Sequence, residues 1–459
     1  MNKSAESYIK KFEFNNSTLS KREKQVLEKL VAAAELTVPL YEAQKNSKYP
    51  GANFYPSDAT REEIEKAAKK TPAILSPYTF VERKGKQLVA IPYSKKFKKE
   101  LSQISKLLKE AASLSDDNAL KAYLAARAED LLGDNFDKSN ILWLKTVDSK
   151  IGFVLGPFDR FLDKHFHQKR AYTAWVGILH KEQTNQMQVF AKAMLTSERR
   201  YLPGAKLAKT AEARVRLEDS LCMAGMDADF SFVSNNLPSS ADVNLIKKVG
   251  TMSTVFLPVL RWKFSHYLKP IYQNVFAGAL QKKYSDQELE LALLRMSVLD
   301  ELRRSLVRYD DATLRLGETF AYIDEVYGDI STIKSATYLY LKGLLREEDL
   351  EAILLAEVCQ ALSYISATNK KAQYAFLAKG YIALLSFLLN GDALQKTTKG
   401  FSFDMKRVLI VVDQLEGVLD YYIALGTRKD TKEFFENLDE RSVFEKFQPY
   451  FPSPHKAGE

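Results

Sequence analysis

The chain has 459 residues, of which 46% are hydrophobic and 27% are charged. This balance is typical of a globular protein with more than one domain and excludes a disordered or fibrous chain. The net charge of +9 comes from 67 basic and 58 acidic residues that are interspersed, so it predicts a solvated surface rather than a nucleic-acid-binding patch.

Targeting and redox signals are weak. No apolar stretch approaches the length of a membrane-spanning helix, and the polar start of the chain is not typical of a signal peptide. The two cysteines, Cys222 and Cys359, lie in apolar surroundings without a CxxC spacing, which indicates buried thiols in a reducing compartment. We therefore expect a cytoplasmic protein with no membrane or nucleic-acid partner.

Helical and strand patterns alternate in the first half of the chain. Apolar spacing predicts a helix over 21–44, and Thr60 with Glu63 forms a capping box for another helix that ends near Lys70. Alternation over 78–83 and 87–91 predicts a hairpin. Further elements are expected as a helical stretch over 97–132 with a break near 116–117, and as strands at 150–155, 171–178 and 229–233.

The second half is almost wholly helical over 253–425, with breaks expected at 284–285, Gly328, 369–370 and 391–392. These patterns predict an α+β fold that is predominantly α. We expect a mixed α/β lobe over 1–252, a helical lobe over 253–425, and a C-terminal segment over 426–459 that packs back on the body.

A series of short motifs resembles the dipeptidyl-peptidase III family, including its shorter bacterial members. The resemblance extends over residues 50–390. Its motifs are Asn53-Phe54-Tyr55-Pro56 with Asp58, Ser76-Pro77-Tyr78-Thr79, Ile91-Pro92-Tyr93-Ser94, 155–163, Asn236-Leu237-Pro238, 300–304 and 324–329. It implies a helical lobe that carries zinc, a mixed lobe with a small β-barrel, and a cleft between them. The implied chemistry is zinc-assisted removal of dipeptides from peptide N-termini.

The zinc-binding positions of that family are changed here. The resemblance implies two histidines one helical turn apart, and these positions hold Asp300 and Arg304. It places the general base at Glu301 and the third zinc ligand at Glu325. An arginine has no lone pair to offer and stays protonated, and no histidine occurs between 267 and 454 to replace the missing ligands. We therefore expect no zinc and no other cofactor, with Glu301 left as a relic base.

Two further positions indicate lost catalysis. Phe161 stands where the family has a tyrosine that stabilises the oxyanion, and the segment 368–372 lacks the family's substrate-contacting histidine. Arg304 is then hypothesised to replace the ion by bridging Glu325 and Asp300. An active hydrolase remains an alternative, in which the carboxylates of Asp300, Glu301 and Glu325 hold Mg²⁺ or Mn²⁺.

Residues at substrate-facing positions keep polar character. Asn236 and Ser239 match the family's peptide-binding segment, and Asp159 matches the glutamate that holds the substrate amino terminus. The main hypothesis is a catalytically inactive protein that binds a peptide or a protein partner in its cleft. The alternative is that these residues are inherited scaffold and that the chain is a structural or assembly protein.

Overall fold

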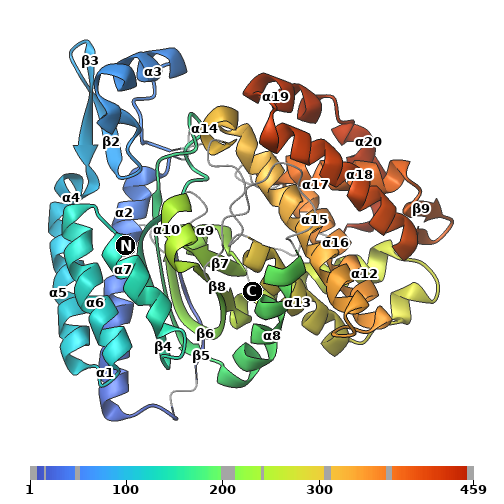
Figure 1. The fold of residues 1–459 in the computed structure, drawn as a ribbon, viewed down its shortest axis with the longest axis horizontal. Coiled ribbons are helices and arrows are strands. Elements are labelled where there is room, and N and C mark those ends of the chain that lie inside the picture. The colour runs from blue at the N-terminus through green and yellow to red at the C-terminus, as the bar shows by residue number, and fades with distance from the viewer. Residues whose placement is uncertain are drawn as a thin grey trace. The chain divides into compact units, whose positions relative to one another are not determined.

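The computed structural model describes residues 8–14, 17–46, 52–197, 212–238, 242–303, 312–368 and 375–451. The chain forms two compact units (Figure 1). The first comprises Met1–Gln186 and Arg214–Pro258, and the second comprises Met187–Ala213 and Val259–Glu459. The fold is α+β and mostly helical, as predicted. No helix in the described ranges is long and apolar enough to cross a membrane.

A six-stranded sheet forms the centre of the first unit. Its strand order is β4-β5-β6-β8-β7, and β1 also pairs with β6. The strand order has two ends, one of which is β7, so the sheet does not close into a full barrel. It is a curled half-barrel. The strands are β1 (Ile9–Lys11), β4 (Ile151–Asp159), β5 (Ala171–Leu179), β6 (Ala213–Gly225), β7 (Ser234–Leu237) and β8 (Thr251–Phe256).

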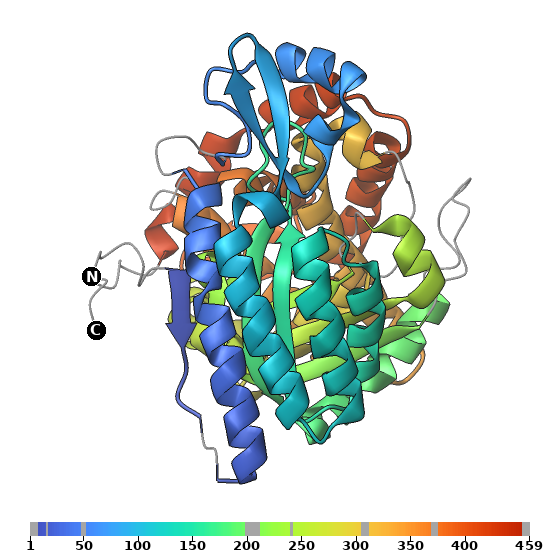
Figure 2. The ribbon, with the colours of Figure 1, turned by 90° about the vertical axis from the view of Figure 1, so that its left-hand side faces the viewer.

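Helices cover this sheet, and Figure 2 shows the blue and teal ones side by side in front of it. The expected helix over 21–44 is divided at Leu36, and the strand expected at 229–233 is replaced by a short helix followed by β7. The hairpin of β2 (Thr79–Lys84) and β3 (Gln87–Pro92) forms as predicted. The helices are α1 (Lys21–Glu35), α2 (Thr37–Gln44), α3 (Arg61–Lys70), α4 (Tyr93–Lys96), α5 (Lys98–Leu114), α6 (Asn118–Gly133), α7 (Asp137–Trp143), α9 (Met226–Phe230) and α10 (Val243–Val249).

The second unit is a helical bundle with one small hairpin, β9 (Leu394–Thr397) and β10 (Gly400–Phe403). The break expected at Gly328 is absent, because α15 continues through this buried position. Gly380 lets α17 approach α15 closely, since a Cβ there would lie 2.7 Å from the carbonyl oxygen of Tyr322. The helices are α11 (Leu257–Lys263), α12 (Lys269–Val275), α13 (Asp286–Arg303), α14 (Ala312–Leu316), α15 (Thr319–Leu341), α16 (Glu347–Thr368), α17 (Ala375–Asn390), α18 (Met405–Ala424), α19 (Arg428–Glu436) and α20 (Glu440–Phe447), while α8 (Lys181–Ser197) runs from the first unit into the second.

The connection from β4 to β5 has no regular structure and is organised by Asp163, which is 3% exposed. Its carboxylate also accepts a 3.5 Å hydrogen bond from the Tyr55 hydroxyl, and burial followed by this carboxylate raises the pKa of Tyr55. The main-chain N–H groups that donate to Asp163, at 2.9–3.1 Å, are those of His165, Phe166, Gln168 and Lys169. One buried carboxylate therefore satisfies most of the turn's inward-facing donors.

Lys169 follows in the same connection and is fully buried. Its ammonium donates to the carbonyl oxygens of Ile74 (2.7 Å) and Ser76 (2.9 Å) and to the hydroxyl of Thr79 (2.6 Å). Burial lowers the pKa of Lys169 to about 7, against the attraction of Asp163, which raises it. The segment Ser76–Thr79 is thus held by a lysine nearly a hundred residues further along the chain.

Arg170 completes the connection by joining three distant segments. Its carbonyl oxygen accepts hydrogen bonds of 3.0 Å from both Gln44 and the Tyr93 hydroxyl. Its guanidinium forms two bonds to the carboxylate of Asp242, at 2.7 and 3.0 Å, and one to the hydroxyl of Tyr78 at 3.1 Å. Four of the motifs used in the sequence comparison therefore meet at the β4–β5 connection, those that contain Tyr55, Thr79, Tyr93 and Asp163.

A buried ion pair lies on the central sheet, between two residues of strand β6. Arg216 donates to Glu218 on β6, and their side chains are 2% and 1% exposed. Arg216 also donates to the carbonyl oxygens of Thr146 (3.1 Å) and Val147 (2.9 Å). The Glu218 carboxylate fits because Gly152 and Gly177 lie opposite each other on β4 and β5.

We expect Gly152→Ala to destabilise the protein by about 1–3 kcal/mol, because its Cβ would lie 1.7 Å from Oε1 of Glu218 and would displace a buried charge. Gly417→Ala is the matched control, since nothing lies within 4 Å of its Cβ in the interior of α18. It should stabilise by roughly 0.5–1 kcal/mol. Urea unfolding of both variants checks this, and an equal effect in both would contradict it.

The pKa of Lys169 gives a second test. The unfolded lysine keeps its proton up to about pH 10.5, whereas the folded one loses it near 7. The unfolded state therefore binds more protons above neutral pH, so the free energy of unfolding should rise between about pH 7 and 8.5, by up to about 1.4 kcal/mol per pH unit. Lys169→Met should remove this part of the slope, as measured by urea unfolding across the range. Parallel pH profiles for the two proteins would rule the assignment out.

Candidate functional site

The candidate residues from the sequence fall in both units. Asp159 ends β4, Phe161 lies in the turn that follows, and Asn236 is on β7, all in the first unit. In the second unit, α13 carries Asp300 and Glu301, and α15 carries Glu325. Ser239 and Arg304 lie outside the described residues, so the predictions that rest on them stay predictions.

Asn236 is held rigidly at the end of the sheet, and its side chain is 6% exposed. Its amide nitrogen donates to the hydroxyls of Thr251 (3.1 Å) and Ser253 (2.8 Å), both on β8. The Oδ1 atom is also buried, and no donor reaches it from the part of the chain that the structure describes. Two hydroxyls therefore fix the rotamer and leave one preoriented acceptor.

The main chain of β7 is also placed to pair with another strand. The N–H of Phe256 donates to the carbonyl of Val233, and the register pairs Ser234 with Val255 and Asn236 with Ser253. In an antiparallel ladder, hydrogen-bonded pairs alternate with pairs whose N–H and C=O groups point outward. The outward set here contains Ser234 and Asn236. The main-chain groups of Asn236 face the side of β7 where no further strand pairs among the described residues.

The ring of Phe161 packs in an aromatic cluster. Its centroid lies 5.9 Å from that of His167 and 5.9 Å from that of Phe232. Phe232 in turn stacks on Phe230 at 5.3 Å and 17°. A phenyl ring has no hydroxyl to donate, so this position supplies no oxyanion contact. Asp159 is half-buried at the end of β4, where it pairs with Ala171.

In the second unit, the charges of Asp300 and Glu325 act on Tyr381 of α17. Its ring stacks on Tyr364 of α16, with centroids 4.7 Å apart and 7° between the planes. Burial raises the pKa of Tyr381 well above its ordinary value, and the charges of Asp329, Glu325 and Asp300 add to this rise. Asp300 and Glu325 thus both contribute to the electrostatic environment of this buried hydroxyl.

Glu301 is 5% exposed on α13, so it is a core residue rather than part of a solvated helix face. Asp329 is 2% exposed and lies one turn from Glu325 on α15. The sequence comparison quoted Asp329 within a motif but gave it no role, and it did not single out Tyr381. A carboxylate one turn after another, inside an otherwise apolar helix, was the available signal.

Over the residues that the structure describes, no group of three or more His, Cys, Asp or Glu side chains has a geometry able to hold a metal. Asp300, Glu301 and Glu325 offer oxygen ligands alone, whereas zinc sites in proteins usually include imidazole or thiolate ligands. The pKa of the Tyr381 phenol is raised chiefly by burial, so the phenol stays neutral.

Comparison with curated proteins gives a relative that is longer than this chain. No family model matches the chain. Among curated proteins it resembles Nudix hydrolase 3 of Arabidopsis thaliana, with 25% identity over 348 residues that cover 68% of this chain and 44% of that protein. The chain thus spans less than half the length of the curated relative it matches.

Two solved structures are similar over nearly their whole length. Dipeptidyl-peptidase III from Corallococcus sp. strain EGB superposes with a TM-score of 0.85 and 22% identity, covering 97% of this chain and 94% of that one. DPP III from Caldithrix abyssi gives a TM-score of 0.77 and 21% identity, covering 96% and 95%. The chain therefore has the dipeptidyl-peptidase III fold, which its motifs had indicated.

Proposed function

We propose that this chain is a non-catalytic protein of dipeptidyl-peptidase III fold that binds extended peptides along the outer edge of β7. The proposal rests on the position of Asn236. Its amide nitrogen donates to two hydroxyls on β8, whereas its main-chain groups point away from β8 and no donor among the described residues reaches its Oδ1 atom. A peptide strand added at this edge would gain main-chain hydrogen bonds from Asn236.

The inactivity in this proposal rests on chemistry that the residues do not supply. Without a metal, bound water keeps its ordinary pKa of about 15.7, so a carboxylate such as Glu301 has no readily deprotonated nucleophile beside it. Phe161 offers no donor to a tetrahedral intermediate. The likeness to Nudix hydrolase 3 adds no hydrolase activity to the proposal, because the aligned stretch covers less than half of that protein.

A structural role is the second candidate, and the same contacts favour it. Asn236 holds β7 on β8, and the motif residues of the first unit are engaged in internal hydrogen bonds. Such residues persist in a fold whether or not a ligand is bound. Peptide binding therefore decides between the two candidates.

We place the protein in the cytoplasm. Both cysteines are buried and free, and burial raises the pKa of Cys222 to about 12. A thiol held protonated in the core reacts slowly, which suits a structural residue in a reducing compartment.

The peptide proposal predicts weak binding by the wild-type chain. Calorimetry with blocked extended peptides of five to six residues should give dissociation constants on the order of 0.1–1 mM. Asn236→Ala should weaken binding at least about tenfold, because it removes the preoriented acceptor and loosens β7. Asn244→Ala is the matched control, since Asn244 is an exposed asparagine on α10. Absence of heat with every peptide would leave the structural role.

The loss of zinc is tested by restoring the ligands. We expect the wild-type chain to carry no stoichiometric zinc, to leave dipeptide-naphthylamide substrates intact, and to keep its melting temperature in chelator. The double substitution Asp300→His with Arg304→His restores an i, i+4 imidazole pair and should gain about one zinc per chain. Asp300→His with Arg303→His is the control, because it adds the same two imidazoles without the i, i+4 spacing. The proposal would be contradicted if the wild-type protein held about one zinc per chain and lost both this zinc and a peptidase activity in chelator.

A further inference from the structure

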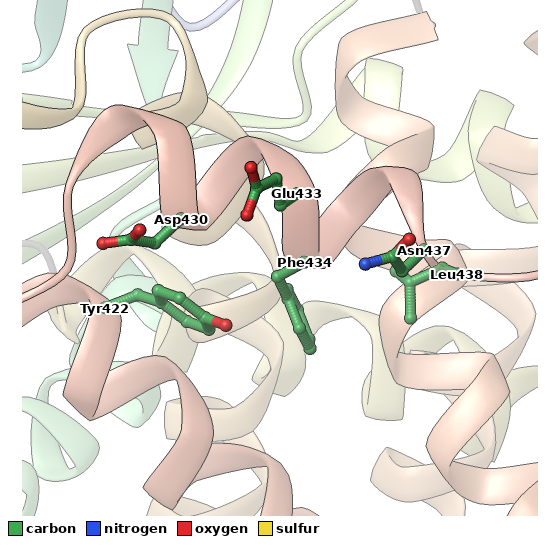
Figure 3. A pocket seen from close by; sticks show the side chains of 6 residues that line it. All are labelled: Tyr422, Asp430, Glu433, Phe434, Asn437 and Leu438. Carbon is green, nitrogen blue, oxygen red and sulfur yellow. The ribbon is translucent and has the colours of Figure 1, made fainter.

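An open pocket of about 410 Å³ lies in the second unit, between the end of α18 and α19. Its lining residues are Tyr422, Asp430, Glu433, Phe434, Asn437 and Leu438. Figure 3 shows the ring of Tyr422, from α18, below Asp430, with the ring of Phe434 beside it. The peptide proposal above does not use any of these residues.

The walls of the pocket are aromatic and fixed in place. The rings of Tyr422 and Phe434 lie 5.2 Å apart at 38°, and Phe434 also packs edge-on against Phe435. Gly426 lies so close behind Tyr422 that a Cβ there would be 2.8 Å from the Cδ1 atom of the ring. Arg315 holds the same chain turn by donating to the carbonyl oxygens of Tyr422 and Gly426. The aromatic face therefore has little freedom to collapse into the space.

Negative charge surrounds these rings. Asp430 forms a capping box with Thr427, and the hydrogen bond from the main chain of Thr427 is the largest cause that lowers the pKa of Asp430. Glu433 lies one turn further along α19. The pKa of Tyr422 is raised by burial first, and then by the charges of Asp430, Tyr421 and Glu433. Both carboxylates are thus close enough to act on the aromatic ring.

The helix adds to this field. The pocket extends to Asn437 and Leu438, just past the last residue of α19, where the free carbonyl groups of a helix carry partial negative charge. Aromatic faces, two carboxylates and a helix C-terminus all favour a cation, and the apolar walls favour one on a hydrocarbon stem. The ion pair already present is weak, since Lys429 lies 3.6 Å from Glu433 and both side chains are exposed.

We propose that this pocket binds the arginine side chain of a partner polypeptide. A guanidinium is planar, so it stacks on an aromatic ring and at the same time donates to a carboxylate in its own plane. Tyr421 on α18 and Leu425, which directly follows this helix, are 55% and 73% exposed. They offer apolar contacts to the neighbours of that arginine. The partner motif is therefore an arginine flanked by apolar residues, on a protein that docks at the α18–α19 corner.

The test uses the full chain and a dye-labelled, blocked peptide in which one arginine stands between two leucines. Fluorescence anisotropy should give a dissociation constant on the order of 1 mM or tighter, and the affinity should fall as salt rises. The same peptide with citrulline, which is neutral and nearly isosteric, should bind at least about tenfold more weakly. Free arginine amide should compete only weakly, because it lacks the flanking apolar contacts.

Two variants separate this site from others. Glu433→Gln and Phe434→Ala should each weaken the arginine peptide at least about fivefold. Glu445→Gln is the matched control, because Glu445 is an exposed glutamate on α20 that pairs with Arg441 at i, i+4. Asn236→Ala should also leave this binding unchanged, so failure here is distinct from failure of the β7 proposal. Equal binding of the arginine and citrulline peptides, or wild-type affinity in Glu433→Gln, would overturn the inference, as would no binding at all.

Discussion

The first unit depends on the need to satisfy the polar groups of one buried connection. Residues between β4 and β5 lie in neither a helix nor a strand, and much of this segment is buried. A chain segment in that position must find acceptors and donors elsewhere, because each buried group left unpaired costs about 1–3 kcal/mol. The carboxylate of Asp163 accepts hydrogen bonds from main-chain N–H groups of the turn. Lys169 joins the turn to the segment before the β2–β3 hairpin, and Arg170 joins it to the end of α2.

This constraint gives the motif residues of the first unit a structural role that does not depend on catalysis. Tyr55, Thr79 and Tyr93 each come from a different motif, and each bonds to the β4–β5 connection. Replacing any one of these residues would leave a buried hydrogen-bonding group without its partner. Asp300, Glu301 and Glu325 lie apart from this connection, on helices of the second unit. At 21–22% identity with the two solved structures, the residues that hold the fold together are those expected to remain.

Local patterns predicted much of the fold, and distant contacts account for what they missed. Apolar spacing located α5, α6 and the β2–β3 hairpin, because each closes its own pattern within a short stretch. Strand β6 was missed because Arg216 and Glu218 interrupt its apolar alternation. Their pairing is visible only once Gly152 and Gly177 are known to lie against them. The helix break expected at Gly328 failed for a similar reason, since packing on all sides stabilises α15 through that residue.

In the candidate sites, too, the sequence indicated individual residues but not the contacts between distant parts of the chain. The resemblance singled out Asp300 and Glu325, but their shared effect on the pKa of Tyr381 depends on the packing of three helices. The internal bonds of Asn236 also depend on the register between β7 and β8, which no local pattern supplied. The pocket between α18 and α19 left no motif, because a cation site of this kind needs only aromatic and acidic side chains at ordinary helical spacing.

Loss of catalysis and retention of binding are compatible because they depend on different groups. Hydrolysis needs a metal or another source of an activated nucleophile, together with a donor for the developing oxyanion, and a single substitution removes either. Strand addition uses main-chain N–H and C=O groups, which side-chain substitutions leave in place as long as the sheet keeps its register. In this chain the register at the end of the sheet is fixed by the bonds from Asn236 to Thr251 and Ser253. A protein that drifted away from peptidase chemistry would therefore lose its capacity to pair with an extended chain last.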